Sequence, residues 1–212
     1  MIYSFTLKDG VMSNDNDTEF AFVIEGIIDR NGVIVIESVK QQDQLRSKGY
    51  GEKIKDMYIL ESYEALFLLY CKRLVLKEQK NILDFSNFLQ TLLKIDLFIF
   101  TKFLIFRDLR TRGYIAKEGF GFGNDFRVYE RGKYSRKAAK YVIFGINEGI
   151  SIKANTLFQN IRSIEKMGKE AIIAVIERRG EIIYYKVNLK KFDKNIKLIE
   201  EKYDRIKSQI AM

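Results

Sequence analysis

Apolar and polar residues alternate along the chain in a way that predicts strands first and helices later. Two short apolar runs, Phe20–Ile24 and Val33–Ile36, are separated by Asp29-Arg30-Asn31-Gly32, a sequence typical of a turn. The polar segment Ser13–Asp17 precedes them and is typical of a loop. We therefore expect residues 1–40 to be built mainly from short strands.

Helical spacing begins near Ser62, which we predict to be the N-cap of a helix with Leu66, Leu69 and Tyr70 on one face. A second helix is predicted by an apolar stripe made of Phe85, Phe88, Leu89 and Leu92. Both stripes favour packing in a core over a ligand pocket. We place a domain boundary near Asp96, although no glycine- or serine-rich linker marks it.

The second half of the chain predicts a smaller mixed unit. Phe103, Phe106 and Leu109 continue a helix that Gly113 would end in a left-handed conformation. A strand is predicted over Asp125–Glu130, and its alternation places Arg127 and Tyr129 together on one face. Further predictions are a strand over Lys140–Phe144, a helix over Asn155–Met167, and a hairpin of Ala171–Glu177 and Glu181–Val187.

These elements predict an α+β protein. Residues 1–96 would form an N-terminal mixed α/β domain, and residues 97–190 would form a small α+β domain with flanking helices. Residues 191–212 carry apolar positions at helical spacing and would form an amphipathic C-terminal helix. That helix would pack on this chain or on a neighbouring subunit.

Composition narrows the function classes. The net charge is +9, from 37 basic and 28 acidic residues, which favours a polyanionic partner. There is no histidine and only one cysteine, Cys71, which we expect to be buried, so a metal site is not expected. No apolar run approaches the roughly 20 residues that span a bilayer, and the N-terminus lacks a signal-peptide layout. We expect a cytoplasmic protein without a cofactor.

Glycines at 119, 121 and 123 first suggest a phosphate-binding loop. Their spacing is G-x-G-x-G, and a strand follows where a nucleotide fold would place a helix. The simpler interpretation is a tight turn between strands, since glycine adopts conformations that other residues avoid.

An ordered series of short motifs occupies the region from Arg107 to Gly132: Asp108-Leu109-Arg110, Arg112-Gly113-Tyr114, Phe122-Gly123 and Asp125-Phe126, followed by Tyr129. This region resembles the tRNA-splicing endonucleases (tRNA-intron lyases) of archaea and eukaryotes. It extends to Leu45–Leu76, with its Gly-Tyr-Gly turn and Glu-Ala-Leu helix, and to Phe158–Val187. About four-fifths of the chain is covered, without the first forty residues and the tail.

The resemblance implies a set of site residues. Tyr129 matches a catalytic tyrosine, and Lys169 matches a lysine that stabilises the charged pentavalent phosphate. Arg162 matches an arginine that clamps a bulged base, and Arg127 is a second candidate for contact with RNA. The family also uses a catalytic histidine, whose position Ala138 occupies here. Lys137 and Lys140 flank it, but a lysine with a pKa near 10.4 is a poor general acid at neutral pH.

The resemblance also implies an assembly of four subunits that recognises bulge-helix-bulge precursor tRNA. It would excise introns without metal, leaving a 2′,3′-cyclic phosphate and a 5′-hydroxyl. A chain without histidine fits the structural subunit of a heterotetramer, beside a catalytic subunit. The family docks an acidic loop in a basic pocket of the opposing dimer; here the loop has mixed charge and comprises Glu177, Arg178, Arg179, Gly180 and Glu181. This departure leaves open whether the chain donates that contact or provides the pocket. Two alternatives stay open: a self-sufficient nuclease using Tyr129 and Lys169, or a non-nuclease RNA-binding or assembly protein.

Overall fold

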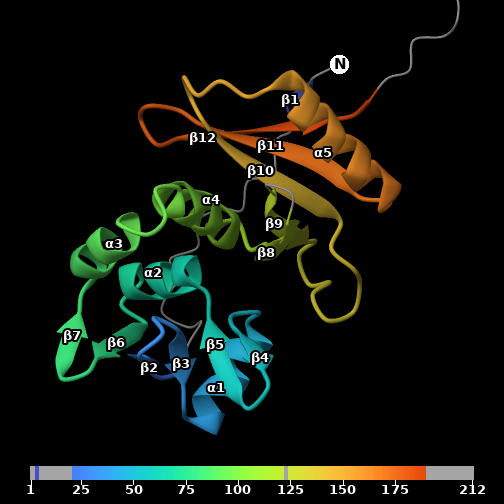
Figure 1. Cartoon of the computed structure of the whole chain (residues 1–212). Coiled ribbons are helices and arrows are strands. Elements are labelled where there is room, and N and C mark those ends of the chain that lie inside the picture. The colour runs from blue at the N-terminus through green and yellow to red at the C-terminus, as the bar shows by residue number, and fades with distance from the viewer. Residues whose placement is uncertain (1–2, 5–20, 122–123, 190–212) are drawn as a thin grey trace, which may run out of the picture.

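The computed structural model describes residues 3–4, 21–121 and 124–189 of the chain. Two mixed sheets form two layers, and a central helix, α4 (Ile99–Thr111), lies between them (Figure 1). The N-terminal sheet has the strand order β4 (Glu52–Ile54), β5 (Met57–Leu60), β3 (Ile34–Ile36), β2 (Ile24–Ile28), β6 (Leu74–Glu78) and β7 (Asn81–Leu83). The predicted α+β class is confirmed.

The first hairpin forms where the sequence predicts it, but its first strand is displaced. The strand expected over Phe20–Ile24 begins only at Ile24 and runs to Ile28. The turn explains this, because the Asp29 carboxylate accepts the backbone N–H groups of Asn31 and Val33, each at 2.8 Å. The hydrogen bond from Val33, and to a lesser extent that from Asn31, lowers the pKa of Asp29. Strand pairing therefore continues directly into the turn.

Three helices accompany this sheet: α1 (Val39–Ser47), α2 (Ser62–Tyr70) and α3 (Phe85–Leu93). The stripe in α3 packs against the core as predicted, with Phe88 buried. The prediction of Ser62 as N-cap is wrong by one residue. Glu61 is the N-cap, and it exchanges hydrogen bonds with Glu64 in a capping box, so Ser62 is already the first helical residue.

The predicted stripe in α2 is only partly right. Leu66 is buried, Leu69 is half-buried, and Tyr70 is 54% exposed. The helix is instead buried over most of its circumference because it lies between its own sheet and α4 (Figure 1). Cys71, at the C-cap of α2, is half-buried, not buried as expected.

The C-terminal sheet has the order β1 (Tyr3–Ser4), β12 (Ile182–Val187), β11 (Glu170–Ile176), β10 (Tyr141–Asn147), β9 (Asn124–Tyr129) and β8 (Ile115–Gly121). Strands β10 and β11 are parallel and are connected through helix α5 (Ala154–Lys166), whereas β11 and β12 form the predicted antiparallel hairpin. Gly113 ends α4 with a φ of +79°, as predicted. The glycines at 119 and 121 fall within or at the end of β8, whose pairing with β9 is irregular between Glu118 and Gly121.

The central strand β10 is buried on both faces. Tyr141 and Ile143 belong to the large core that also contains residues of α4, while Val142 and Phe144 belong to a second core under α5. Helices α4 and α5 therefore cover opposite faces of this sheet (Figure 1). Packing on both faces stabilises the register of β10 with its neighbours β9 and β11.

The two halves of the molecule share one apolar core. Tyr63 of α2 lies with its ring centroid 5.0 Å from that of Phe106 in α4 and 5.1 Å from that of Phe126 in β9. Aromatic pairs at such distances stabilise packing beyond the area that they bury. Apolar contacts therefore hold the N-terminal layer against the C-terminal layer.

A buried polar junction reinforces this contact. Lys117 of β8 donates to Glu64 Oε1 of α2 at 2.9 Å and to the carbonyl of Gly51 at 2.7 Å. The second carboxylate oxygen of Glu64 accepts the N–H of Gly51 at 2.9 Å. Both side chains are buried, so the pair is stable only because each charge is compensated by the other and by hydrogen bonds.

Arg110 of α4 completes the junction from the other side. Its guanidinium lies 4.0 Å from the centroid of the Tyr50 ring and donates to the Tyr50 hydroxyl and to the carbonyl of Lys48. The Gly-Tyr-Gly turn needs glycine here: Gly51 has a φ of +63°, and a Cβ on it would lie 2.9 Å from the carbonyl oxygen of Ile59.

The boundary at Asp96 stays a prediction, and the tail helix expected over 191–212 lies outside the described residues, as does the loop expected over Ser13–Asp17. In the part of the chain that the structure describes, no helix combines the length and the apolar character needed to cross a membrane.

Candidate functional site

The C-terminal sheet places β9, β10 and β11 side by side, and the predicted triad positions lie on or next to the ends of these strands. Tyr141 of β10 pairs with Val128 of β9 on one side and with Glu170 of β11 on the other. Lys140 precedes β10; its backbone N–H donates to the carbonyl of Val128, and its carbonyl accepts the N–H of Glu170, each at 3.0 Å. Tyr129 at the end of β9 and Lys169 just before β11 are therefore separated by the width of β10, about 10 Å across the sheet.

Lys169 contacts the segment that carries the alanine. Its Nζ donates a hydrogen bond of 2.6 Å to the carbonyl of Ala139, the residue after Ala138. The same ammonium group lies 5.4 Å from the centroid of the Phe120 ring, and the Arg127 guanidinium lies 5.8 Å from that ring. The Lys169 ammonium group and the Arg127 guanidinium therefore both lie near the Phe120 ring.

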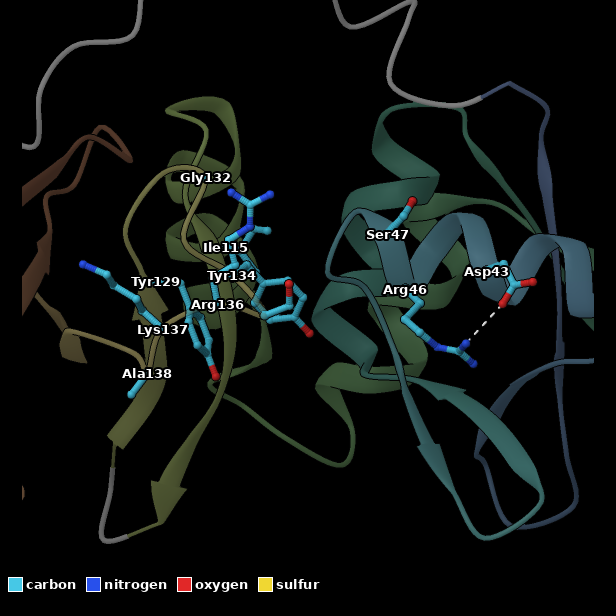
Figure 2. A pocket seen from close by; sticks show the side chains of 11 residues that line it. Asp43, Arg46, Ser47, Ile115, Tyr129, Gly132, Tyr134, Arg136, Lys137 and Ala138 are labelled. Atoms are coloured by element: carbon cyan, nitrogen blue, oxygen red, sulfur yellow. Dashed lines mark hydrogen bonds and ion pairs between the residues drawn. The ribbon is translucent and has the colours of Figure 1, made fainter.

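Tyr129 and Ala138 line one pocket of about 1000 Å³. The Tyr129 ring meets the Tyr134 ring edge to face, with centroids 5.0 Å apart. Figure 2 shows the Tyr129 hydroxyl directed toward the side on which Ala138 lies, and Tyr134 projecting toward α1. The pocket is formed by the 129–138 segment on one side and by α1 on the other, with Asp43, Arg46 and Ser47 as lining residues.

Neither lysine beside Ala138 replaces a histidine. Lys140 donates to Glu130 at 2.9 Å, and this hydrogen bond raises the pKa of Lys140 above its ordinary value and lowers the pKa of Glu130. An ammonium group with a raised pKa is a weaker proton donor. Lys137 lines the pocket, but Figure 2 shows its side chain directed away from α1.

The two predicted RNA-binding arginines differ in their settings. Arg127 is half-buried on the same face of β9 as Tyr129, and its Nε is buried without a hydrogen-bond partner in the described residues. Arg162 is exposed on α5 and does not line the pocket. The structure thus places Tyr129 and Ala138 in one pocket and Lys169 in contact with the carbonyl of Ala139, and leaves Arg162 on the surface; their roles stay predictions.

The predicted interface loop is the turn of the β11–β12 hairpin. Arg178, Arg179 and Glu181 are exposed, and Glu177 is half-buried. The turn is closed by hydrogen bonds from Glu177 N to Glu181 O and from Gly180 N to Glu177 O. The Glu148 carboxylate accepts the N–H of Arg178 at 3.2 Å, which ties the turn to the end of β10.

Sequence reasoning did not find the other wall of the pocket. Helix α1 is mostly polar and carries no motif, so nothing in the sequence signalled that Asp43, Arg46 and Ser47 would face the loop. Tyr134 and Arg136 were also missed, although both lie within the loop that follows the recognised Tyr129. Among the described residues, no group of three or more cysteine, aspartate or glutamate side chains could hold a metal ion.

Comparison with known proteins matches both halves of the chain. The family profile described as the tRNA intron endonuclease catalytic C-terminal domain matches residues 99–184, and the N-terminal domain of the same endonuclease matches residues 24–89. These ranges contain the whole pocket.

Individual relatives agree. A protein named tRNA-splicing endonuclease from Methanococcus vannielii is 31% identical over 72% of this chain and 86% of its own length. Proteins with the same name from Methanothermobacter thermautotrophicus and Thermococcus onnurineus are 31% and 29% identical, each over 74% of this chain and over 92% and 91% of their own lengths. The chain belongs to the tRNA intron endonuclease family, and the resemblance predicted from its motifs is confirmed.

Proposed function

We propose that this chain is the structural subunit of a heteromeric tRNA-splicing endonuclease. A single observation supports the proposal: the chain has no histidine, and Ala138, which the resemblance aligns with the catalytic histidine, lines the same pocket as Tyr129. The substrate would be a precursor tRNA with a bulge-helix-bulge fold. The partner would be a second family member that carries the histidine.

Physical chemistry supports a non-catalytic role. A methyl group cannot transfer a proton, and a positioned general acid or base contributes about 10²–10⁴-fold in rate. Lys140, two residues after Ala138, is paired with Glu130. This pairing raises the pKa of Lys140, so the ammonium group holds its proton more firmly than that of an isolated lysine. The residues that line the pocket include no histidine, the side chain whose ordinary pKa lies nearest to neutral pH.

Other features support binding of RNA. The net charge of +9 favours a polyanion, and the residues that line the pocket include three cations, Arg46, Arg136 and Lys137, and one carboxylate, Asp43. The relatives that the chain matches over most of its length are named tRNA-splicing endonucleases.

The assembly would use the β11–β12 turn. Its exposed Arg178, Arg179 and Glu181 present both signs of charge on a short, hydrogen-bonded loop. Complementary charges on a partner set specificity and register more than raw affinity. We propose that this turn contacts the catalytic subunit, which cuts at both intron ends and leaves a 2′,3′-cyclic phosphate and a 5′-hydroxyl.

The test is cleavage of a bulge-helix-bulge precursor tRNA by the pure chain, by a histidine-bearing family member from the same genome, and by the two together. We expect cleavage at both ends only in the mixture, together with a stable complex in size-exclusion chromatography. Robust cleavage by the pure chain would favour the self-sufficient nuclease. No complex and no effect on cleavage would favour an RNA-binding or assembly protein with another role.

A further inference from the structure

The pocket has a second wall that the triad positions do not explain. Asp43, Arg46 and Ser47 line it from α1 in the N-terminal layer, while Tyr129, Tyr134 and Arg136 line it from the C-terminal layer. Figure 2 shows these two groups on separate elements, with Tyr134 projecting toward α1 and with Arg46 and Asp43 directed toward each other. The volume of about 1000 Å³ is at the upper end of the range for small-molecule sites. There is room for more than a scissile phosphate.

One wall offers an aromatic surface. Tyr134 is half-buried, is braced edge to face by Tyr129, and projects toward α1 (Figure 2). Burial raises the pKa of the Tyr134 hydroxyl, so the ring is neutral at physiological pH. A braced, neutral ring on a pocket wall suits stacking with a nucleobase, since every base has a π-face.

The walls also carry guanidinium groups. The Arg46 side chain is 56% exposed and forms one ion pair with Asp43, at 3.1 Å, which leaves other guanidinium donors for a ligand. Arg136 is exposed on the opposite side. Arginine suits phosphate because its planar fork matches the phosphate oxygens.

We propose that this pocket binds one nucleotide of a single-stranded RNA segment without cutting it, with the base against Tyr134 and its phosphate on Arg46 and Arg136. This inference rests on the proposed function and assigns a task to the histidine-free pocket. It also gives α1 a direct part in substrate binding. An acidic peptide would engage the two arginines but would have no use for the ring.

The absence of tryptophan from the chain makes stacking measurable. A Tyr134→Trp variant of the full chain carries a single tryptophan at the proposed stacking position. The probe is a five-nucleotide single-stranded RNA with 2′-O-methyl riboses, which removes the nucleophile, and an otherwise identical abasic oligonucleotide serves as its counterpart. We expect the base-containing probe to quench the tryptophan fluorescence and the abasic probe to leave it nearly unchanged.

Affinity and salt dependence test the arginines. Arg46→Gln should weaken binding of the same probe and reduce the slope of log K against log salt by about 0.7, the value for one phosphate contact on a single strand. Arg30→Gln is the matched control, because Arg30 is an exposed arginine in the β2–β3 turn and does not line the pocket. Tyr134→Ala should weaken binding by about 5- to 100-fold, whereas Tyr134→Phe should retain it. Arg136→Gln gives a second surface variant with little risk to folding.

The outcomes separate this inference from the proposed function. If the chain and its mixture bind RNA and the mixture cleaves, but Arg46→Gln behaves like Arg30→Gln or both probes quench equally, the pocket inference alone is wrong. Displacement by an acidic peptide with no dependence on the base would overturn it in favour of a protein ligand. If neither the chain nor the mixture binds RNA and the mixture does not cleave, both the inference and the proposed function fail.

Discussion

The junction between the two layers and the pocket beside it lie within a few residues of each other in the fold but differ in how completely their groups are partnered. At the junction, Lys117, Glu64 and the Gly51 backbone satisfy one another in a buried network. In the pocket, Tyr134 is half-buried and Arg46 and Arg136 are exposed, and Ala138 is the residue that the resemblance aligns with a catalytic histidine. The groups at the junction are fully partnered within the chain, whereas the pocket has exposed cations and no histidine.

This difference indicates where a substitution should lower the stability of the protein and where it should not. Removing one partner from a buried charge pair leaves an uncompensated charge, so the junction is sensitive to single substitutions. Replacing an exposed pocket residue affects folding little, since surface changes are usually within about 0.5 kcal/mol. A fold held by the junction can therefore lose a catalytic side chain and remain intact.

The largest expected effect on stability is at the junction. Lys117→Met should lower the free energy of unfolding by about 3–5 kcal/mol, because Glu64 would remain buried without its cation. Urea denaturation measures this. Lys77→Met is the control, since Lys77 pairs with Glu25 at 2.8 Å on the surface and should contribute at most about 1 kcal/mol. Equal losses in the two variants would contradict the importance of burial.

The second prediction concerns the pocket. Ala138→His should give the isolated chain cleavage of precursor tRNA that exceeds the unmodified chain by about 10²-fold or more, because Tyr129 and Lys169 already flank the position. Single-turnover assays measure the rate. Ala138→Gln is the matched control, which adds polar bulk without a group that titrates near pH 7. A folded Ala138→His variant without any gain would show that more than the histidine has been lost.

The third prediction returns to the junction from the side of α4. Arg110→Gln should cost about 2 kcal/mol of stability, because it removes the cation over the Tyr50 ring and hydrogen bonds to Tyr50 and Lys48. Tyr50→Phe removes only the hydroxyl and should cost about 1 kcal/mol. Thermal denaturation of both variants separates the two contributions. A larger loss for Tyr50→Phe would contradict the stacking argument.

The smallest effect is expected in alkaline solution. Burial, followed by the nearby Asp108 carboxylate, raises the pKa of Tyr184 well above its ordinary value near 10. A folded-state pKa above the unfolded one gives a contribution that is complete below pH 10 and is lost as the pH rises toward the folded-state pKa. The stability of the natural chain should therefore fall more steeply above pH 10 than that of Tyr184→Phe, by up to about 1.4 kcal/mol per pH unit. Parallel slopes would exclude Tyr184 as a source of alkaline sensitivity.

Local patterns predicted much of the fold. The helices over 85–93 and 99–111, the glycine end of α4 and the final hairpin follow from periodicity and turn chemistry, which act within a few residues. The burial of α2 over most of its circumference did not follow, because it depends on α4 and a sheet that are distant in sequence. The position of Ser62 was misjudged because Glu61 and Glu64 form the capping box one residue earlier.

The site divides in the same way. The resemblance identified Tyr129, Lys169 and Ala138; Tyr129 ends β9, Ala138 lies in the segment before β10, and Lys169 directly precedes β11. The α1 wall could not be predicted, since its polar residues have no pattern that distinguishes a pocket from an ordinary solvated face. Lys117 was likewise inconspicuous in the sequence, because only the folded structure shows its burial against Glu64.

The central claim is that this chain positions RNA while its partner cuts. The most direct test is the single-turnover cleavage rate of the reconstituted enzyme carrying Tyr129→Phe in this chain, compared with the same change at the matching tyrosine of the histidine-bearing subunit. Phenylalanine keeps the ring and removes only the hydroxyl. We expect less than about a threefold effect from this chain and a loss of about 10²-fold or more from the partner. A comparable loss from Tyr129→Phe would show that this pocket takes part in the chemistry and would contradict the account.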